Sequence, residues 1–465
     1  MHASFKTSLE EYEPTKKKVQ PNGDKCIIVI GMRAARKLTL SRRISQGLGF
    51  KVLGLDDCFV RRNGDIRKFI KSNGWEKFRE LETQYAAKVL GSKDYSRGYV
   101  ISTGGGIVEA EPSRALLQNY TKSGGIVLHL HRDLDTTVSF LSSDASRPAY
   151  LDEIISVWKR REKWYNSCLN YHFFLAHCDT DIEFEHLRNS FINYLRLICG
   201  QRKTIIPNSR SSFVCLTYPN LAEVEGDILE EVTSGSSAVE LRVDLLGSHE
   251  SIYVAEQVAI LRKHSSKPII YTVRTVSQGG KFDDNDIEGI ERLSFLGIKL
   301  GVEFLDVQLT YPTKVIDHIM ENCGYTRILG SHHDFSGTLK WNSTEWETKY
   351  SQALEMGVDI VKFVGTAVDF RDNLYLETFR NEHTSKPLIA INMGEKGKLS
   401  RVLNTVFTPI THKALPASAA PGQLSLAEIN ETFAAIGGAS AKKFWVVGEP
   451  ISHARSPALH TAAYA

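Results

Sequence analysis

A lysine and a histidine pair stand in short apolar segments of the C-terminal half of the chain. Lys362 lies between Val361 and Phe363, and His332 and His333 follow an apolar run that ends at Gly330. A lysine in an apolar strand has an ordinary structural explanation, in which its stem packs and its ammonium reaches water. With a histidine one strand away and arginines nearby, desolvation and neighbouring cations instead favour a neutral, nucleophilic amine. The combination favours the chemical explanation for Lys362.

These residues stand near the ends of regularly spaced strand candidates. Glu240 and Arg242 are two apart and share one face of a strand, Arg274 ends the next candidate, and Asp334 follows a later one. Strand candidates alternate with helical intervals at 213–217, 239–243, 268–274, 300–307, 326–331, 359–364, 387–392 and, less clearly, 402–407. Eight strand–helix units predict a TIM barrel, with its site at the carboxyl ends of the strands. A doubly wound sheet is the alternative, but it does not require eight units.

Six segments in chain order resemble the type I 3-dehydroquinate dehydratases. They are Glu240–Asp244, Tyr271–Thr275, Gly330–Phe335, Asp359–Lys362, Met393–Gly394 with Ser400–Arg401, and Ala420–Gln423. The resemblance implies that Lys362 forms a Schiff base with the substrate ketone. It implies that His333 removes the α-proton and passes a proton to the departing hydroxyl. Five further side chains match positions that hold the substrate hydroxyls and carboxylate: Glu240, Arg242, Arg274, Arg401 and Gln423.

Two positions depart from the bacterial members of that family. Those members place a glutamate beside the catalytic histidine, and the aligned residue here is Gln278, which is similar to the fungal form of the family. We therefore expect the orientation of His333 to be less well supported than in the bacterial enzymes. Ala419 stands where many members have a serine in a lid.

An altered phosphate-binding loop follows the apolar run at Cys26–Ile30. Such a loop reads G-x-x-x-x-G-K-[ST], and Gly31–Leu38 keeps only Gly31 and Lys37. Arg36 replaces the glycine that lets backbone N–H groups close around phosphates, and Leu38 replaces the hydroxyl residue that holds Mg²⁺. Thr39 is a poor substitute for Leu38, because one residue along a helix turns the side chain by about 100°. The loop is therefore predicted to have lost its nucleotide site.

Residues 24 to about 190 otherwise resemble shikimate kinase, and their losses fall on the nucleotide side. The D-x-D of that family becomes Gly54-Leu55-Asp56, which removes a carboxylate that helps to organise magnesium. Tight turns and surface salt bridges are the ordinary explanations for glycines and arginines. Their occurrence together in family order instead favours a pocket for a carboxylate and hydroxyls. The residues of that pocket would be Asp56, Arg79, Gly104, Gly105, Gly106 and Arg161, and Arg147-Pro148 matches the lid.

The chain divides into four predicted parts. Residues 1–22 are polar and are expected to form a disordered leader, and residues 23–200 form a three-layer kinase-like α/β domain with a parallel sheet. A polar linker leads to the barrel at residues 208–437. Residues 443–465 contain Gly448–His460, which resembles the opening of shikimate dehydrogenase. We interpret this segment as a truncated third domain without the nucleotide-binding part of that enzyme.

Composition excludes several classes of protein. The chain has 465 residues, of which 42% are hydrophobic and 24% charged, and no apolar run is long enough to span a membrane. Its seven cysteines are scattered without C-x-x-C spacing, which predicts neither a disulfide framework nor a zinc site and indicates an intracellular location, cytoplasmic or nuclear. No metal or cofactor is predicted. A net charge of +3 gives no basis for direct DNA binding, and the oligomeric state is left open, a homodimer included.

Two functions follow from these resemblances. The order of segments resembles the C-terminal part of the fungal pentafunctional aromatic-pathway proteins, and the altered loop makes the chain resemble the fungal quinate repressors more. That family implies a negative regulator of quinate-utilisation genes, which binds a transcription activator protein and senses quinate- and shikimate-pathway acids. A pocket that is retained without its chemistry suits a sensor. The alternative is an active type I 3-dehydroquinate dehydratase with an inactive kinase-like domain, so the sequence leaves enzymatic activity open.

Overall fold

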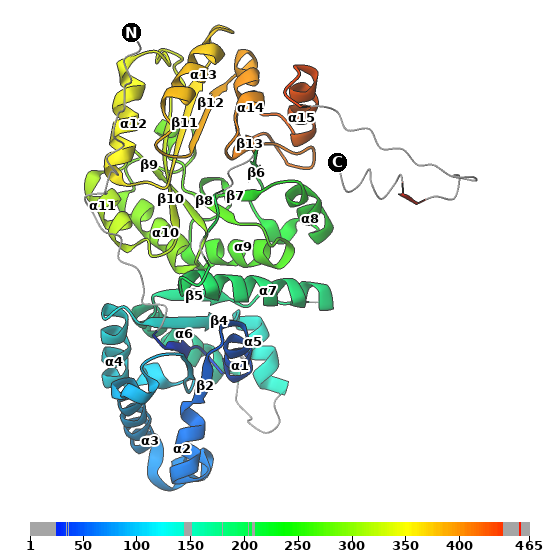
Figure 1. The fold of residues 1–465 in the computed structure, drawn as a ribbon. Helices are drawn as coiled ribbons and strands as arrows, with labels where there is room; N and C mark the ends of the chain where they lie inside the picture. The colour runs from blue at the N-terminus through cyan, green and yellow to red at the C-terminus, as the bar shows by residue number, and fades with distance from the viewer. Residues whose placement is uncertain are drawn as a thin grey trace.

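The computed structural model describes residues 25–33, 35, 37–143, 151–178, 180–202, 204–206, 210–439 and 455–456. The predicted leader, Arg36, the Arg147-Pro148 lid and all but two residues of the 443–465 segment lie outside the described residues. Within the described part, the chain builds two parallel sheets, one of five strands and one of eight (Figure 1). No helix among these residues combines the length and apolar character that a membrane crossing needs.

The five-stranded sheet has the order β2-β3-β1-β4-β5, and all its neighbours are parallel. Its central strand is entirely apolar and buried, as expected for a parallel sheet covered on both faces. Ile27 and Val29 face a core shared with α1 and α7, and Ile28 and Ile30 face a second core shared with α3, α4 and α6. The strands are β1 (Ile27–Ile30), β2 (Lys51–Gly54), β3 (Tyr99–Ser102), β4 (Ile126–His131) and β5 (Tyr171–Phe174). The helices are α1 (Lys37–Leu48), α2 (Leu55–Asn63), α3 (Ile66–Gly91), α4 (Glu111–Lys122), α5 (Leu134–Ser143), α6 (Leu151–Cys168) and α7 (Asp181–Ile198).

The eight-stranded sheet has the order β12-β11-β10-β9-β8-β7-β6-β13 and curls into a nearly closed parallel barrel. The prediction of a TIM barrel rather than a doubly wound sheet is confirmed. The strands are β6 (Ser212–Leu216), β7 (Ala238–Arg242), β8 (Ile269–Thr272), β9 (Phe304–Gln308), β10 (Arg327–His333), β11 (Ile360–Thr366), β12 (Leu388–Met393) and β13 (Thr408–Ile410). The helices are α8 (Gly226–Ser234), α9 (Ser251–His264), α10 (Ile287–Lys299), α11 (Thr313–Asn322), α12 (Thr344–Met356), α13 (Asp372–Glu382), α14 (Lys398–Leu403) and α15 (Leu426–Ala435).

The last predicted strand, residues 402–407, is wrong. Val402 and Leu403 end α14, and the eighth strand begins only at Thr408. Between them Phe407 has a φ of 45°, a left-handed conformation that interrupts a strand. Short apolar runs in buried helices and buried strands look alike in sequence, which explains the displacement.

The barrel interior has an apolar layer beneath a polar one. Buried apolar side chains form a cluster inside the barrel, with Ala238, Ile270, Phe304, Leu329 and Ile360 among its members. Because side chains alternate along a strand, the residue two positions further on points to the same side, nearer the carboxyl end. Those residues are Glu240, Thr272, Asp306, Ser331 and Lys362, and all five are buried. The strand alternation therefore places a ring of polar groups at one level of the barrel.

Helix α7 joins the two sheets, and it lies between them in Figure 1. Its Ser190 hydroxyl donates to the carbonyl of Arg262 at 2.9 Å, and Lys263 forms an ion pair with Glu183 at 2.9 Å. The hydroxyl of the buried Tyr194 lies 3.3 Å from the carbonyl of Lys299. These contacts anchor the first sheet to α9 and to the end of α10.

Candidate active site

Lys362 is buried inside the barrel and held by two carboxylates. Its Nζ lies 3.0 Å from Glu240 Oε1 and 2.9 Å from Asp306 Oδ2, and its side chain is 4% exposed. The stem therefore does not carry the ammonium to water, and the ordinary structural explanation fails. The direct partners of Lys362 are anions. Of the nearby arginines, Arg242 pairs with Asp244, and Arg274 pairs with Asp306, which it shares with Lys362.

Asp306 is the residue at which this network converges, and it was not among the predicted site residues. Its Oδ2 accepts from both Lys362 and Arg274, the latter at 2.7 Å, and its Oδ1 accepts from the Ser331 hydroxyl at 2.5 Å. Burial alone would raise the pKa of this carboxyl, but Arg274 and Lys362 lower it below its ordinary value. A signal was present in the sequence, since an aspartate between Leu305 and Val307 in an apolar strand candidate needs a buried partner.

Glu240 is the second anion of the network. It accepts from Lys362 and, at 2.8 Å, from the Thr272 hydroxyl. Burial would raise its pKa, but Lys362, Arg242 and Arg274 together lower it far below the ordinary value. Glu240 is therefore ionised throughout the physiological range and places a negative charge 3.0 Å from Lys362 Nζ.

His333 ends β10 next to this network. Both of its ring nitrogens lie against Arg274 Nη1, with Nε2 at 2.7 Å. Burial, followed by the charges of Arg274 and Lys362, holds the pKa of His333 well below its ordinary value. The imidazole is therefore neutral at neutral pH and has a lone pair available to accept a proton.

Gln278 supports the backbone of this histidine rather than its ring. Its Oε1 accepts from the backbone N–H of His333 at 2.8 Å, and its side chain is buried in the loop after β8. The position that aligns with a bacterial glutamate thus still contacts the predicted catalytic histidine. It fixes the end of β10 by a neutral hydrogen bond.

Arg242 and Arg401 differ in what they bind. Arg242 forms a bidentate pair with Asp244, with nitrogen–oxygen distances of 2.8 and 2.7 Å. Arg401 is fully buried, makes only long contacts of 3.5 and 3.4 Å to the carbonyls of Pro409 and Pro421, and has an unpartnered Nε among the described residues. Burial lowers the pKa of Arg401 to about 10, so it still carries a full charge at neutral pH. A buried guanidinium without a carboxylate is suited to receive one from a ligand.

Gln423 completes the predicted set. It lies in the loop after β13, where its Oε1 accepts from the Ala419 N–H at 2.9 Å and its Nε2 contacts Cys215 Sγ at 3.4 Å. The structure thus brings Lys362, Glu240, Arg242, Arg274 and His333 into one network, with Arg401 and Gln423 at its β6–β13 side.

The site as a whole has an excess of positive charge. Its four basic side chains are Lys362, Arg242, Arg274 and Arg401, and its three carboxylates are Glu240, Asp244 and Asp306. The excess of one positive charge suits a monocarboxylate.

The kinase-like sheet also brings its predicted acid-binding residues together. Arg79 Nη1 pairs with Glu82 at 2.5 Å, and a Cβ at Gly106 would overlap the Arg79 guanidinium. At Gly104, a Cβ would meet the carboxylates of Glu82 and Asp56. The glycines therefore allow close approach of charged side chains, beyond a simple turn. Glu82 is buried, its Oε1 has no hydrogen-bond partner among the residues that the structure describes, and sequence reasoning missed it.

Arg161 and Gly105 are the other two predicted acid-binding residues. Arg161 Nε pairs with Glu109 at 2.7 Å, and Gly105 accepts from the Tyr165 hydroxyl. In the altered loop, Lys37 Nζ donates to the carbonyls of Gly31 and Met32, both at 2.9 Å. Burial lowers the pKa of Lys37 to about 8, partly offset by Asp56. Leu38 lies in the first turn of α1, where it offers no metal ligand.

Comparisons with known proteins match each of the two sheets to a protein family. Residues 212–440 match the family model for type I 3-dehydroquinase, and residues 33–195 match the model for shikimate kinase. A solved S. pombe AroM structure, described as dehydroquinate dehydratase and shikimate dehydrogenase, is 40% identical with a TM-score of 0.52, and covers 55% of this chain and 50% of that one. The fold is thus that of a shikimate kinase-like domain followed by a type I dehydroquinase barrel.

The whole chain, and not only each domain, is similar to larger fungal proteins. The whole chain is 55% identical to the pentafunctional AROM polypeptide of Komagataella phaffii and 50% identical to that of Candida tropicalis. It spans about 30% of the length of these relatives. The chain is therefore homologous, from end to end, to the shikimate kinase and dehydroquinase part of the fungal pentafunctional AROM polypeptides.

Proposed function

We propose that the barrel is a type I 3-dehydroquinate dehydratase, which removes water from 3-dehydroquinate through a Schiff base on Lys362. The observation that carries this proposal is the buried Lys362 Nζ, fixed by Glu240 and Asp306 beside a neutral His333. The amine adds to the ketone and releases water, which leaves a cationic iminium. The iminium draws electrons from the neighbouring carbon, so that His333 can take the α-proton.

The elimination of water then needs no cofactor, because the side chains account for every proton and electron pair that moves. The electron pair left by the α-proton forms a carbon–carbon double bond, and the β-hydroxyl departs with a proton from His333. Water finally hydrolyses the iminium and regenerates Lys362. Glu240 and Asp306, which hold the ammonium at 3.0 and 2.9 Å, are placed to stabilise the iminium charge in the same way.

The direct test uses the full chain with 3-dehydroquinate and borohydride. We expect turnover to a conjugated enone, followed by ultraviolet absorbance, and reductive trapping of one ligand on the peptide that contains Lys362. A folded protein that binds 3-dehydroquinate but shows neither turnover nor an adduct would contradict the proposal.

Replacement of Arg401 by glutamine should weaken substrate binding more than it slows the reaction. Charge-assisted hydrogen bonds contribute about 1.5–3 kcal/mol, so KM should rise about 10- to 100-fold while kcat changes less. Steady-state kinetics measure both constants. Arg327→Gln is the matched control, because Arg327 begins β10 at the opposite end of the barrel and pairs with Asp359. An unchanged KM in Arg401→Gln would remove Arg401 from the carboxylate site.

For the kinase-like domain we propose binding of a hydroxylated carboxylic acid without phosphoryl transfer. The altered loop motivates this proposal, with Leu38 at the magnesium position and Lys37 bound to backbone carbonyls. Calorimetry on the full chain should detect shikimate or quinate but no tight Mg·ATP. Tight Mg·ATP uptake, or no uptake of either acid, would contradict it.

A regulatory function would build on such a retained pocket. The role of a quinate repressor, with a transcription activator as partner and a cytoplasmic or nuclear location, stays a prediction from the sequence. Its test is pathway-acid-dependent binding of the full chain to that activator, with Arg79→Gln as the variant expected to lose the acid dependence.

A further inference from the structure

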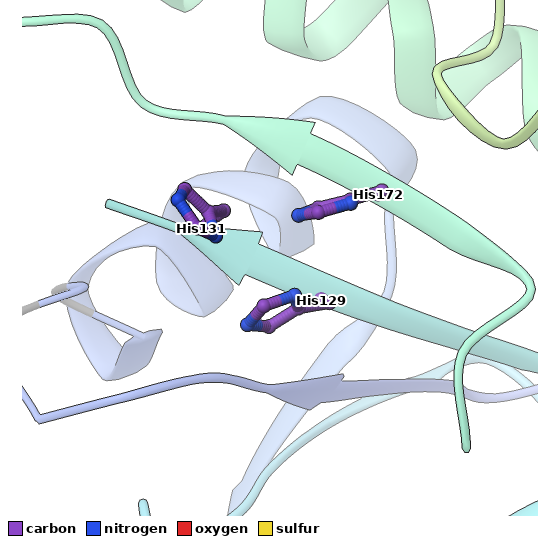
Figure 2. Close-up of side chains that lie close together, drawn as sticks. All are labelled: His129, His131 and His172. Atoms are coloured by element: carbon purple, nitrogen blue, oxygen red, sulfur yellow. The ribbon is translucent and has the colours of Figure 1, made fainter. Parts of the chain in front are cut away.

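Three histidines of the kinase-like sheet gather on one face of β4 and β5. His129 and His131 are two apart in β4, so they point to the same side, and the β4–β5 register places His172 directly beside His129 (Figure 2). One ring nitrogen from each histidine can be chosen so that all three lie within 4.8 Å of one another. Two adjacent strands thus bring three imidazoles close together, with the rings of His129 and His172 stacked at 4.7 Å between centroids.

The three imidazoles are buried with polar atoms left over. Their exposures are 3% for His129, 4% for His131 and 9% for His172. Within the described residues, His129 Nδ1, His131 Nε2 and His172 Nε2 have no hydrogen-bond partner. Three unpartnered buried nitrogens in one place are unfavourable unless a ligand or water binds them.

Aromatic packing explains the ring faces but not these nitrogens. Tyr165 of α6 stacks on His129 at 4.6 Å between centroids, and Phe174 stacks on His131 at 4.1 Å. Stacking fixes ring orientation and excludes water from the faces. It leaves the in-plane lone pairs at the ring edges unsatisfied, which is where an imidazole binds a metal.

Two charges lie near the cluster. The Lys37 charge near His129 opposes a cation, whereas Asp133 near His131 favours one.

We propose that His129, His131 and His172 bind one divalent transition-metal ion, Zn²⁺ or an ion of similar preference. Three nitrogen donors suit such ions, and a tetrahedral site needs nitrogens about 3.3 Å apart, so binding would draw together atoms that now lie within 4.8 Å of one another. The fourth position falls to water or to Glu162, which lines the same small pocket, with space for about one water molecule, as His129 and His131. The ion would cross-link β4 and β5.

This site departs from the prediction of no metal, which rested on cysteine spacing. A strand pair His129-x-His131 and a third histidine 41 residues further on form no recognised sequence motif. Only the pairing of β4 with β5 brings His172 to the other two. The proposal is independent of the dehydratase assignment, since the cluster lies in the other sheet.

The test loads the full chain, without a histidine tag, with Zn²⁺ or Co²⁺ and removes excess metal by dialysis. We expect one tightly bound ion per chain, d–d absorption typical of tetrahedral Co²⁺, and X-ray absorption at the zinc edge that shows three imidazoles at about 2.0 Å. This measurement needs no variant. A bound ion with no imidazole ligands, or no retained ion, would overturn the proposal.

Substitutions of single histidines test which side chains bind the metal ion. His131→Gln and His172→Gln should each weaken Zn²⁺ binding by at least about 100-fold, because loss of a ligand exceeds the 10- to 100-fold effect of outer partners. His318→Gln is the matched control, since His318 is half-exposed on α11 and pairs with Glu291. Circular dichroism and thermal unfolding of each variant, compared with the parent protein, establish that the variants fold. Equal affinity in the control and in folded cluster variants would contradict the assignment.

Discussion

Lys362→Met should abolish dehydratase turnover, with a fall in kcat of roughly 10⁴-fold or more, as expected when a covalent nucleophile is lost. Methionine keeps the packing of the stem and removes only the amine, so no Schiff base can form. Borohydride with 3-dehydroquinate should leave no adduct on the chain, as read by mass spectrometry of the intact protein.

The same substitution should also lower stability. Glu240 and Asp306 lose a shared cation 3.0 and 2.9 Å away, and an uncompensated buried charge costs about 3–5 kcal/mol. Asp306 keeps its ion pair with Arg274, so the loss of the Lys362 charge should cost more free energy at Glu240. Lys314→Met, at an exposed site on α11, is the control and should change neither property. A folded Lys362→Met protein with turnover within tenfold of the parent would rule out the covalent mechanism.

His333→Gln should slow turnover by about 10²- to 10⁴-fold, the usual contribution of general acid–base catalysis. Lys362 is untouched by this change, so a borohydride adduct should still form. The variant would thus separate formation of the Schiff base from loss of the α-proton. Rapid-quench mass spectrometry together with steady-state kinetics measures both steps.

The pH profile gives a second readout on the same residue. The base must be neutral, and the pKa of His333 is held well below the ordinary 6.5 by burial and by Arg274. In the parent protein kcat/KM should therefore stay level as pH falls through 6.5 and decline only at lower pH. The part of this decline that belongs to His333 should vanish in His333→Gln.

His332→Gln is the matched control for these experiments. His332 is the preceding residue of β10, but its ring lies against Trp346, in the core between barrel and helices. Its pKa is lowered to about 4 by burial, so it too is a neutral imidazole. A loss of turnover in folded His332→Gln as large as that in His333→Gln would show that the effect is structural.

The barrel could be predicted from sequence because its strands are continuous apolar runs at regular intervals. Burial on both faces produces such runs, and seven of the eight predicted strands overlap observed ones. The failure at 402–407 has a local cause, since Val402 and Leu403 end the short helix α14 and Phe407 has a left-handed backbone. Lys362 and His333 stood out because lysine and histidine are unusual inside apolar strands.

Their partners were harder to find. Asp306 and Glu240 lie in different strands from Lys362. Their contacts with Lys362 depend on how the strands of the nearly closed barrel are staggered, and not on spacing along the chain. Arg401 was predicted only from the family resemblance, because nothing in its own sequence neighbourhood marks it as a binding residue. What distinguishes it is the absence of a carboxylate partner among the described residues, which depends on the packing around β13.

The sequence by itself determined which segments form strands, which loop lost its phosphate-binding residues and which amine is suited to a Schiff base, because local pattern and residue chemistry act over a few positions. The tertiary structure alone decided which charges neutralise one another, that Arg401 has no carboxylate partner within the described part of the chain and that three histidines gather on β4 and β5. Ion pairing and metal ligation depend on distances of a few ångströms between residues far apart in the chain, and strand register sets those distances.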